Sequence, residues 1–305
     1  MKVLIAPDKF KGTLSAAEAA AAVVRGWRQV RPEDQLHLLP MSDGGDGFGE
    51  VISALLRAGP QTVKTEDAAH RPCETTWWWE AKTKTAIVET AKVIGLAMLP
   101  PGKFHPFELD TFGLGAVLSA AQEKGAKQIL VGIGGSATND GGFGLARALG
   151  WRFVDNHGHP VERWTELHRL SCVHASGLRP FENVTVAVDV QNPLLGPRGA
   201  TRVYGPQKGL RPDDFDLAER VAGRFEIQDA GRAVQLFFDQ PGDAVVDVFR
   251  RCTRIAGRNR DRRRRDDRIL RDRQLRKCKN SAETNQQRHD PCEDGPIDKE
   301  AGHGV

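Results

Sequence analysis

Gly134-Gly135-Ser136-Ala137-Thr138-Asn139-Asp140-Gly141-Gly142 is the stretch that decides the fold class, because it joins a predicted strand to a predicted helix. The strand covers residues 127–133 and the helix covers residues 143–149. The glycines bracket two hydroxyls, an amide and a carboxylate, and successive backbone N–H groups with hydroxyl support form a nest for anions. A structural turn would need only one or two glycines, so we favour binding of a phosphate or another oxyanion. The stretch is neither a P-loop nor a Gly-x-Gly-x-x-Gly fingerprint.

The N-terminal part of the chain repeats the same order of strand, loop and helix. Apolar runs at residues 2–6 and 36–39 predict buried strands, and helices are predicted at residues 15–30 and 50–58. Ser15 opens a capping box at the start of the first helix. This alternation is typical of a parallel sheet that is covered by helices on both faces.

The middle of the chain predicts further strands and helices. Residues 75–80 and 85–89 predict two strands joined by a polar turn, and residues 184–188 predict another strand. Helices are predicted at residues 112–123 and 213–225. Three adjacent tryptophans in the first of these strands cannot all face one side of a sheet, so at least one is exposed or packs against another layer.

Two more loops follow predicted strands and carry charged side chains. The loop after the first strand contains Lys9 and Lys11, which could meet an anionic substrate near a helix N-terminus, although for this loop taken alone a solvated loop is the favoured interpretation. The loop at residues 42–47 contains Asp43 and Asp46, which could hold Mg²⁺, with an Asp-Gly turn as the alternative. Ligands of open α/β sheets bind beyond the carboxyl ends of strands, so these loops and the glycine-rich stretch could converge.

Three other charged residues are candidates for contact with substrate. Asp189 directly follows a predicted strand, where its carboxylate could accept a proton from a substrate hydroxyl, and a helix or turn cap is equally consistent. Arg198 and Lys208 are predicted on short Gly/Pro loops, where each could bind a carboxylate or a phosphate. The nine histidines are scattered, and no pair of them has the spacing of a metal site.

With these segments assembled, the chain resembles the bacterial glycerate kinase family of the glycerate 2-kinase type. The resemblance covers residues 1 to about 225 and keeps the order of the family's motifs. The segments that carry it are Ile5-Ala6-Pro7-Asp8, Phe10-Lys11, Pro40-Met41, Asp43-Gly44-Gly45, the stretch from Gly132 to Gly142, Asp189-Val190, Asn192-Pro193-Leu194, Gly196-Pro197-Arg198-Gly199-Ala200 and Gly205-Pro206-Gln207-Lys208-Gly209.

The resemblance implies a fold of two α/β domains with the active site in the cleft. Residues 1–70 would form the N-terminal half of a Rossmann-like parallel-sheet domain, which is incomplete in this chain, and residues 71–230 would form the second α/β domain. The implied reaction is the phosphorylation of D-glycerate to phosphoglycerate, with 2-phosphoglycerate favoured as the product. ATP would be the phosphate donor and Mg²⁺ would assist.

The resemblance also implies roles for individual residues. Asp189 would act as the base on the glycerate hydroxyl, and Lys11 and Asn139 would join it in catalysis. Asp43 and Asp46 would hold Mg²⁺. The residues expected to bind substrate or phosphate are Asp8, Lys9, Gly134, Gly135, Ser136, Thr138, Asp140, Asn192, Arg198 and Lys208.

The charge of the chain separates it into two unlike parts. The 305 residues carry a formal net charge of +4, but residues 250–277 alone contain 14 basic and 4 acidic residues, so the remainder is acidic. One basic segment without interleaved aromatic residues argues against a broad nucleic-acid surface. The chain has no long apolar run, no signal-peptide pattern, and five widely spaced cysteines, so we expect a reduced cytoplasmic protein.

The α/β pattern ends near residue 230. Residues 231–305 predict a divergent, basic, disordered tail, because too few apolar residues are present to offset the entropy of ordering. A shifted reading frame or truncation is the second interpretation, since the later βα units of the resembling family are missing. Three alternative functions stay open: an inactive kinase fragment, a polyanion-binding protein acting through the tail, and a kinase for another small hydroxy acid. The sequence indicates no particular oligomeric state.

Overall fold

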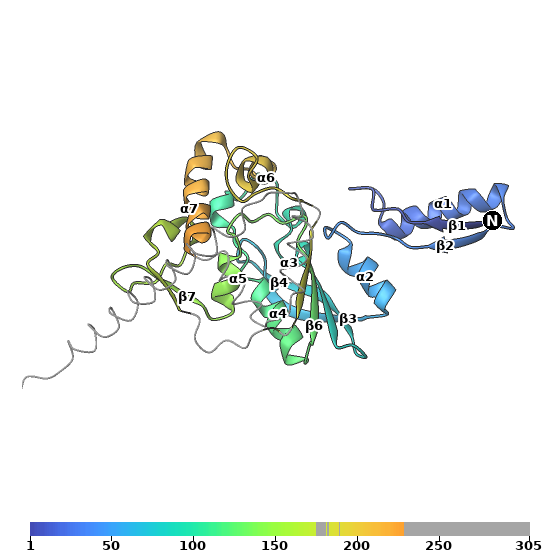
Figure 1. Ribbon diagram of the computed structural model, residues 1–305, viewed down its shortest axis with the longest axis horizontal. Helices are drawn as coiled ribbons and strands as arrows, with labels where there is room; N and C mark the ends of the chain where they lie inside the picture. Colours follow the sequence, from blue (N-terminus) through green and yellow to red (C-terminus); the bar gives the residue numbers. More distant parts are fainter. Residues whose placement is uncertain (175–180, 182, 189, 229–305) are drawn as a thin grey trace, which may run out of the picture. The chain divides into compact units, whose positions relative to one another are not determined.

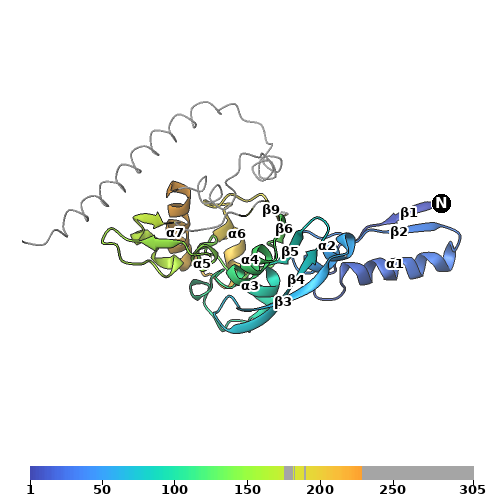
Figure 2. The same cartoon turned by 90° about the horizontal axis from the view of Figure 1, so that it is seen from below.

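The chain begins with two parallel strands joined by a long helix (Figures 1 and 2). In the computed structural model, β1 (Lys2–Ile5) pairs in parallel with β2 (Gln35–Leu38), and α1 (Ala16–Val30) runs alongside them. The predicted capping box is confirmed: the Glu18 N–H donates to Ser15 Oγ, and the Ser15 N–H donates to the Glu18 carboxylate. The strand–helix–strand order predicted for this part of the chain is therefore correct.

The largest sheet of the described residues has five strands in the order β3-β4-β5-β6-β9. Their bounds are β3 (Gly59–Glu66), β4 (Pro72–Glu80), β5 (Thr85–Glu89), β6 (Gln128–Gly132) and β9 (Val184–Ala187). The first three strands pair antiparallel, whereas β5, β6 and β9 pair parallel. The predicted hairpin of β4 and β5 is confirmed, and β3 is an edge strand that the sequence analysis missed. The carboxyl ends of the three parallel strands share one edge of this sheet.

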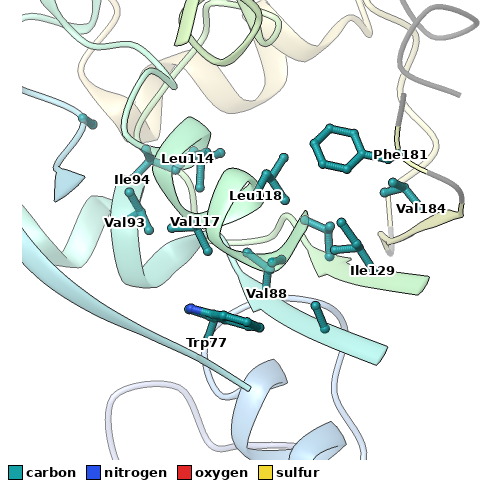
Figure 3. Packing of buried hydrophobic residues seen from close by; sticks show 14 of the residues in the cluster. Trp77, Val88, Val93, Ile94, Leu114, Val117, Leu118, Ile129, Phe181 and Val184 are labelled. Atoms are coloured by element: carbon teal, nitrogen blue, oxygen red, sulfur yellow. The ribbon is translucent and has the colours of Figure 1, made fainter. Parts of the chain in front are cut away.

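One face of this sheet carries the main apolar core (Figure 3). Trp77 on β4, Val88 on β5 and Ile129 on β6 point toward side chains of α3 (Ala91–Ile94) and α4 (Leu114–Glu123). Side chains alternate between the faces of a strand, so the neighbours of these residues face the other way.

The opposite face of the sheet is covered by α2 (Phe48–Leu56). Trp78 and Ile87 form a separate buried cluster there with Phe48. Trp79 returns to the first face, where it is half-buried and packs against Trp77. The prediction that the three tryptophans are divided between layers is confirmed.

Short elements complete the described part of the chain. They are η1 (Leu96–Met98), η2 (Pro106–Glu108), α5 (Phe143–Ala148), β7 (Arg152–Val154), η3 (Trp164–Arg169), β8 (Cys172–His174), α6 (Ala200–Lys208), η4 (Pro212–Asp214) and α7 (Phe215–Gln228). A cluster around Phe143, Phe153, Leu167 and Val221 joins α5, β7, η3 and α7 in a second core.

The prediction that Lys208 lies on a short Gly/Pro loop is wrong. Lys208 is the last residue of α6, and Pro206 lies inside that helix. A proline beyond the first turn of a helix removes one backbone hydrogen bond, so it is uncommon at such a position. Gly209 then ends the helix in the left-handed conformation, with φ of 106°.

The predicted α/β class is confirmed by these elements. The structure describes residues 1–174, 181, 183–188 and 190–228, so Asp189 and the predicted tail at residues 231–305, with its proposed polyanion contacts, lie outside the described residues. The domain boundaries at residues 1–70 and 71–230 stay predictions. In the described ranges, no helix is both long and apolar enough to cross a membrane.

The close packing of α2 on the sheet gives a stability prediction at Gly49. A Cβ atom at this position would overlap the ring of Trp78, so Gly49→Ala should lower the free energy of unfolding by about 1–3 kcal/mol. Gly26 in α1 is the control, because nothing lies within 4 Å of an added Cβ there. Gly26→Ala should raise stability by up to about 1 kcal/mol. Urea unfolding measures both, and a Gly49→Ala variant as stable as the wild type would contradict the packing.

Candidate functional site

Two loops meet in backbone contact at the carboxyl ends of β5, β6 and β9. The Gly134 N–H donates to the Gly44 carbonyl oxygen over 3.0 Å. A Cβ added to Gly134 would lie 2.6 Å from the Gly45 Cα atom, and one added to Gly44 would lie 2.5 Å from the Ala187 carbonyl oxygen. Only residues without side chains allow this approach. The structure thus brings the glycine-rich stretch and the loop at residues 42–47 together.

The loop after β1 joins the same group. The Met41 N–H donates to the Pro7 carbonyl oxygen over 2.9 Å, and Lys9 Nζ donates to Asp43 Oδ1 over 3.1 Å. Asp8 accepts a bond from the backbone N–H of Lys9, whereas Lys11 is exposed. Two candidate residues of this loop, Asp8 and Lys9, are therefore held in contacts, and the third, Lys11, is exposed to solvent.

Asp43 is held in its charged form by its neighbours. Burial opposes ionisation, but the Gly45 N–H and the Lys9 ammonium outweigh it and lower the pKa of Asp43. Asp46 is exposed, and its Oδ1 atom lies 3.0 Å from where a Cβ on Gly135 would stand. The two predicted metal ligands therefore occupy one loop that faces the glycine-rich stretch.

This pair of carboxylates is compatible with Mg²⁺. Among the described residues, no group of three or more His, Cys, Asp or Glu side chains could hold a metal ion. Magnesium usually binds through one or two carboxylates, several waters and the phosphates of a substrate. A donor set of Asp43 and Asp46 fits that pattern, and magnesium binding stays a prediction.

Lys208 reaches the glycine-rich stretch from the end of α6. Its ammonium donates to the Thr138 carbonyl oxygen over 2.6 Å and to Ser136 Oγ over 3.2 Å. Burial lowers the pKa of Lys208 to about 8, although Asp140 opposes the shift. Because the hydrogen-bond partners of the Lys208 ammonium are neutral oxygens, its positive charge is not neutralised by them and still attracts an anion.

Asn139 adds an unused donor to the same stretch. Its Nδ2 atom is buried and has no hydrogen-bond partner in the described part of the chain. Buried amide groups are normally bonded, so an unpaired one is commonly explained by a missing ion, water or ligand. Asn139 is therefore a candidate donor to a bound anion.

Asp140 lies beneath the stretch. Its carboxylate accepts bonds from the Thr111 N–H, the Thr111 hydroxyl and the Gly144 N–H at 3.0, 2.7 and 2.9 Å. Burial raises the pKa of Asp140 above its usual range, although these donors oppose the shift. The contacts tie the stretch to the start of α5, and the phosphate contact expected for Asp140 stays a prediction.

The remaining candidates lie in the segment after β9. Asn192 is exposed, donates from Nδ2 to the Arg198 carbonyl oxygen over 2.9 Å, and accepts a bond from the Tyr204 hydroxyl. The Arg198 side chain is exposed. These contacts order the turn before α6, and their roles toward a substrate stay predictions, as does the role of Asp189.

The sequence analysis missed Glu89 at the end of β5. This side chain is buried, and its two oxygens accept the N–H groups of Gly47 and Gly49 over 3.0 and 2.8 Å. Burial raises the pKa of Glu89, although the two amides oppose the shift. The available signal was a carboxylate as the last residue of a buried apolar strand, where a charge needs specific partners.

The fold and these loops define a class: an α/β protein with a glycine-rich, lysine-supported loop at the carboxyl edge of a mixed sheet. The sequence signature of the glycerate kinase family matches residues 3–237. The chain therefore belongs to the glycerate kinase family.

Known proteins show the extent of the similarity. The chain is 39% identical over 229 residues to a glycerate kinase of Bacillus subtilis (strain 168), covering 74% of this chain and 60% of the relative. It is 38% identical over 213 residues to a glycerate 2-kinase of Escherichia coli (strain K12), with coverage of 68% and 56%. A crystal structure of a protein provisionally named glycerate kinase 2, from Salmonella typhimurium LT2, matches with a TM-score of 0.69 and 30% identity over 83% of this chain and 74% of that chain. The chain spans less than two thirds of the length of either curated relative.

The buried ammonium of Lys208 predicts a specific pH dependence of stability. Its pKa is about 8 in the folded protein and near 10.5 for a free side chain, so the unfolded chain holds this proton more tightly. The wild type should therefore gain stability relative to Lys208→Met as the pH rises from 8 toward 10.5, by at most about 3 kcal/mol. Urea unfolding of both proteins across this range measures the difference.

The control is Ser136→Ala, which removes a hydrogen-bond acceptor but retains the ammonium. This variant should keep the pH slope of the wild type. Parallel stability curves for the wild type and Lys208→Met would show that the ammonium is not buried as described.

Proposed function

We propose that the protein phosphorylates D-glycerate with ATP and Mg²⁺, with 2-phosphoglycerate as the favoured product. The observation that carries the proposal is the partly buried ammonium of Lys208, which donates to the glycine-rich stretch, in a chain of the glycerate kinase family. Phosphoryl transfer needs positioning and charge stabilisation more than covalent chemistry, and such a loop provides both. The proposal as a whole is that the protein is a cytoplasmic kinase that acts on this small-molecule substrate.

The glycine-rich stretch would hold the negative charge of the reactants. The Gly135 N–H, the hydroxyls of Ser136 and Thr138, and the Lys208 ammonium would donate to carboxylate or phosphate oxygens. The Gly134 N–H is already bonded to the Gly44 carbonyl oxygen, so Gly134 would contribute through its close backbone approach. The unpaired amide of Asn139 supports this role, because a bound anion would satisfy it.

Charged residues around the stretch would complete the site. Asp189 would accept the proton of the glycerate hydroxyl, which makes the oxygen a better nucleophile. Lys9, Lys11 and Arg198 would neutralise phosphate charge. Asp8 and Asn192 would order the loops that carry these cations, through the contacts that they already make.

Asp43 and Asp46 would hold the magnesium ion that accompanies ATP. Bound there, the ion would neutralise charge on the phosphates. The chain's own contribution is the shape of the loop: Lys9 and the Gly45 N–H fix Asp43, and the bond from Gly134 fixes the adjoining backbone.

The proposed reaction predicts phosphoryl transfer by the purified full chain. With ATP, Mg²⁺ and D-glycerate, we expect ADP formation that depends on glycerate, together with a phosphate monoester at the 2-hydroxyl in phosphorus NMR spectra. Product at the 3-hydroxyl would contradict the favoured regiochemistry. Other small hydroxy acids in parallel reactions test the alternative substrate, and turnover with none of them would overturn the proposal.

The role of Asp189 predicts a selective loss of turnover. Asp189→Asn should lower kcat about 100-fold or more, because a general base contributes roughly that factor, while the unfolding midpoint stays close to the wild type. Asp213→Asn is the matched control, since Asp213 is exposed on η4. Asp189→Asn with near-normal kcat would contradict the assignment of the base.

A further inference from the structure

Glu89 is a buried carboxylate to which the proposed reaction gives no role. It is the last residue of β5 and only 3% exposed. Val88 faces the core beneath α4, and Ile87 faces α2. Because side chains alternate along a strand, Glu89 shares the face of Ile87 and points toward α2.

The carboxylate of Glu89 occupies the N-terminal end of α2. The N–H groups of Gly47 and Gly49 both donate to it, one to each oxygen. Gly47 is the N-cap residue of α2, and as a glycine it has no side chain that could cap the helix. Free N–H groups and the positive end of the helix dipole both favour a negative group at this point. Glu89 therefore supplies from β5 the cap that α2 lacks in its own sequence.

The same contact fixes one end of the loop that carries Asp43 and Asp46. Gly47 ends this loop, and Glu89 holds it through the backbone. At the other end, the bond from the Gly134 N–H to the Gly44 carbonyl holds the loop against the glycine-rich stretch. Asp46 lies between these two attachments, so its position depends on both.

An ion pair lies near Glu89 but acts differently. Lys92 donates to Glu50 over 2.8 Å, and both side chains are partly exposed. Neither of these side chains bonds to the backbone of residues 43–47 in the described contacts. Glu89 is therefore the acidic side chain of this region that joins the sheet to the loop.

We propose that Glu89 is a positioning residue for metal-nucleotide binding: it holds the loop from Asp43 to Gly47 in the shape that presents both aspartates to magnesium and phosphate. This inference rests on the proposed function. Glu89 touches neither reactant, and it acts through the backbone of Gly47 and Gly49. Replacing a residue that orients a metal ligand typically lowers metal affinity or activity about 10–100-fold.

The test compares Glu89→Gln with Glu74→Gln in the full chain. Glutamine keeps the shape of Glu89 but turns an NH₂ group toward one of the two backbone N–H donors. Glu74 is exposed on β4 in the same sheet and serves as the matched control. Rates are measured against the concentrations of Mg²⁺, ATP and D-glycerate. Hydrogen exchange of residues 44–50 is measured without ligands, and Mn²⁺ binding with ATP is measured by electron paramagnetic resonance.

For Glu89→Gln we expect a rise of at least about tenfold in the Mg²⁺ concentration that gives half-maximal rate. Mn²⁺ binding should weaken similarly, and exchange at residues 44–50 should quicken roughly tenfold, as expected for a lost bond to a charged group. The KM for D-glycerate should change less than twofold, and Glu74→Gln should match the wild type in every measurement.

The outcomes separate this inference from the proposed function. Faster exchange with unchanged Mg²⁺ dependence and Mn²⁺ binding would overturn the positioning role and leave a helix cap. Unchanged exchange would overturn the loop-holding contact itself. If the wild type shows no glycerate-dependent turnover, the proposed function fails, whereas Mn²⁺ binding and exchange still decide whether Glu89 positions the loop.

Discussion

The backbone contact between Gly134 and Gly44 is the constraint on which the candidate site depends. A single such hydrogen bond contributes only about 1 kcal/mol to stability. Its importance is steric, because a side chain at Gly134 would push the two loops apart, and a side chain at Gly44 would collide with Ala187 at the end of β9. With the loops in contact, Asp46 lies beside Gly135 of the glycine-rich stretch, and Asp43 lies on the same loop. The clustering of glycines in these loops follows from this requirement for close approach.

The second constraint is the charge balance of the buried groups at the same edge of the sheet. Lys208 brings an ammonium against neutral oxygens of the stretch, while Asp140 and Glu89 are each surrounded by N–H or hydroxyl donors. The two carboxylates already have their partners and therefore act as supports. Among the described residues, no anionic group bonds directly to the ammonium, which is the arrangement expected of a site that binds a negatively charged substrate. At neutral pH the ammonium remains protonated, because its pKa is about 8.

Local patterns in the sequence predicted much of the fold. The capping box at Ser15, the apolar runs and the division of the three tryptophans each depend on neighbouring residues, so they were predicted correctly. β3 was missed because its few apolar residues form no clear pattern, and its pairing with β4 is a tertiary effect. The helix around Pro206 was missed because glycine and proline usually indicate a loop.

The candidate site was predictable in composition but not in geometry. The sequence showed which loops carry polar residues, and general rules for α/β sheets predicted that the loops could meet. It did not show that Asp140 lies beneath the stretch or that Glu89 caps a helix from another segment. Both facts depend on which strands lie side by side. Partners of buried charges come from distant parts of the chain, so they emerge only from the folded structure.

The most direct test of the account is the affinity of the full chain for its ligands with and without the Lys208 ammonium. Isothermal titration calorimetry with ATP–Mg²⁺ and with D-glycerate would compare the wild type, Lys208→Met and Lys64→Met, in which the replaced lysine is exposed on β3. The account predicts that Lys208→Met weakens binding of at least one ligand about tenfold or more, as expected for a lost bond to a charged group, while Lys64→Met binds like the wild type. Wild-type affinity of Lys208→Met for both ligands would contradict it.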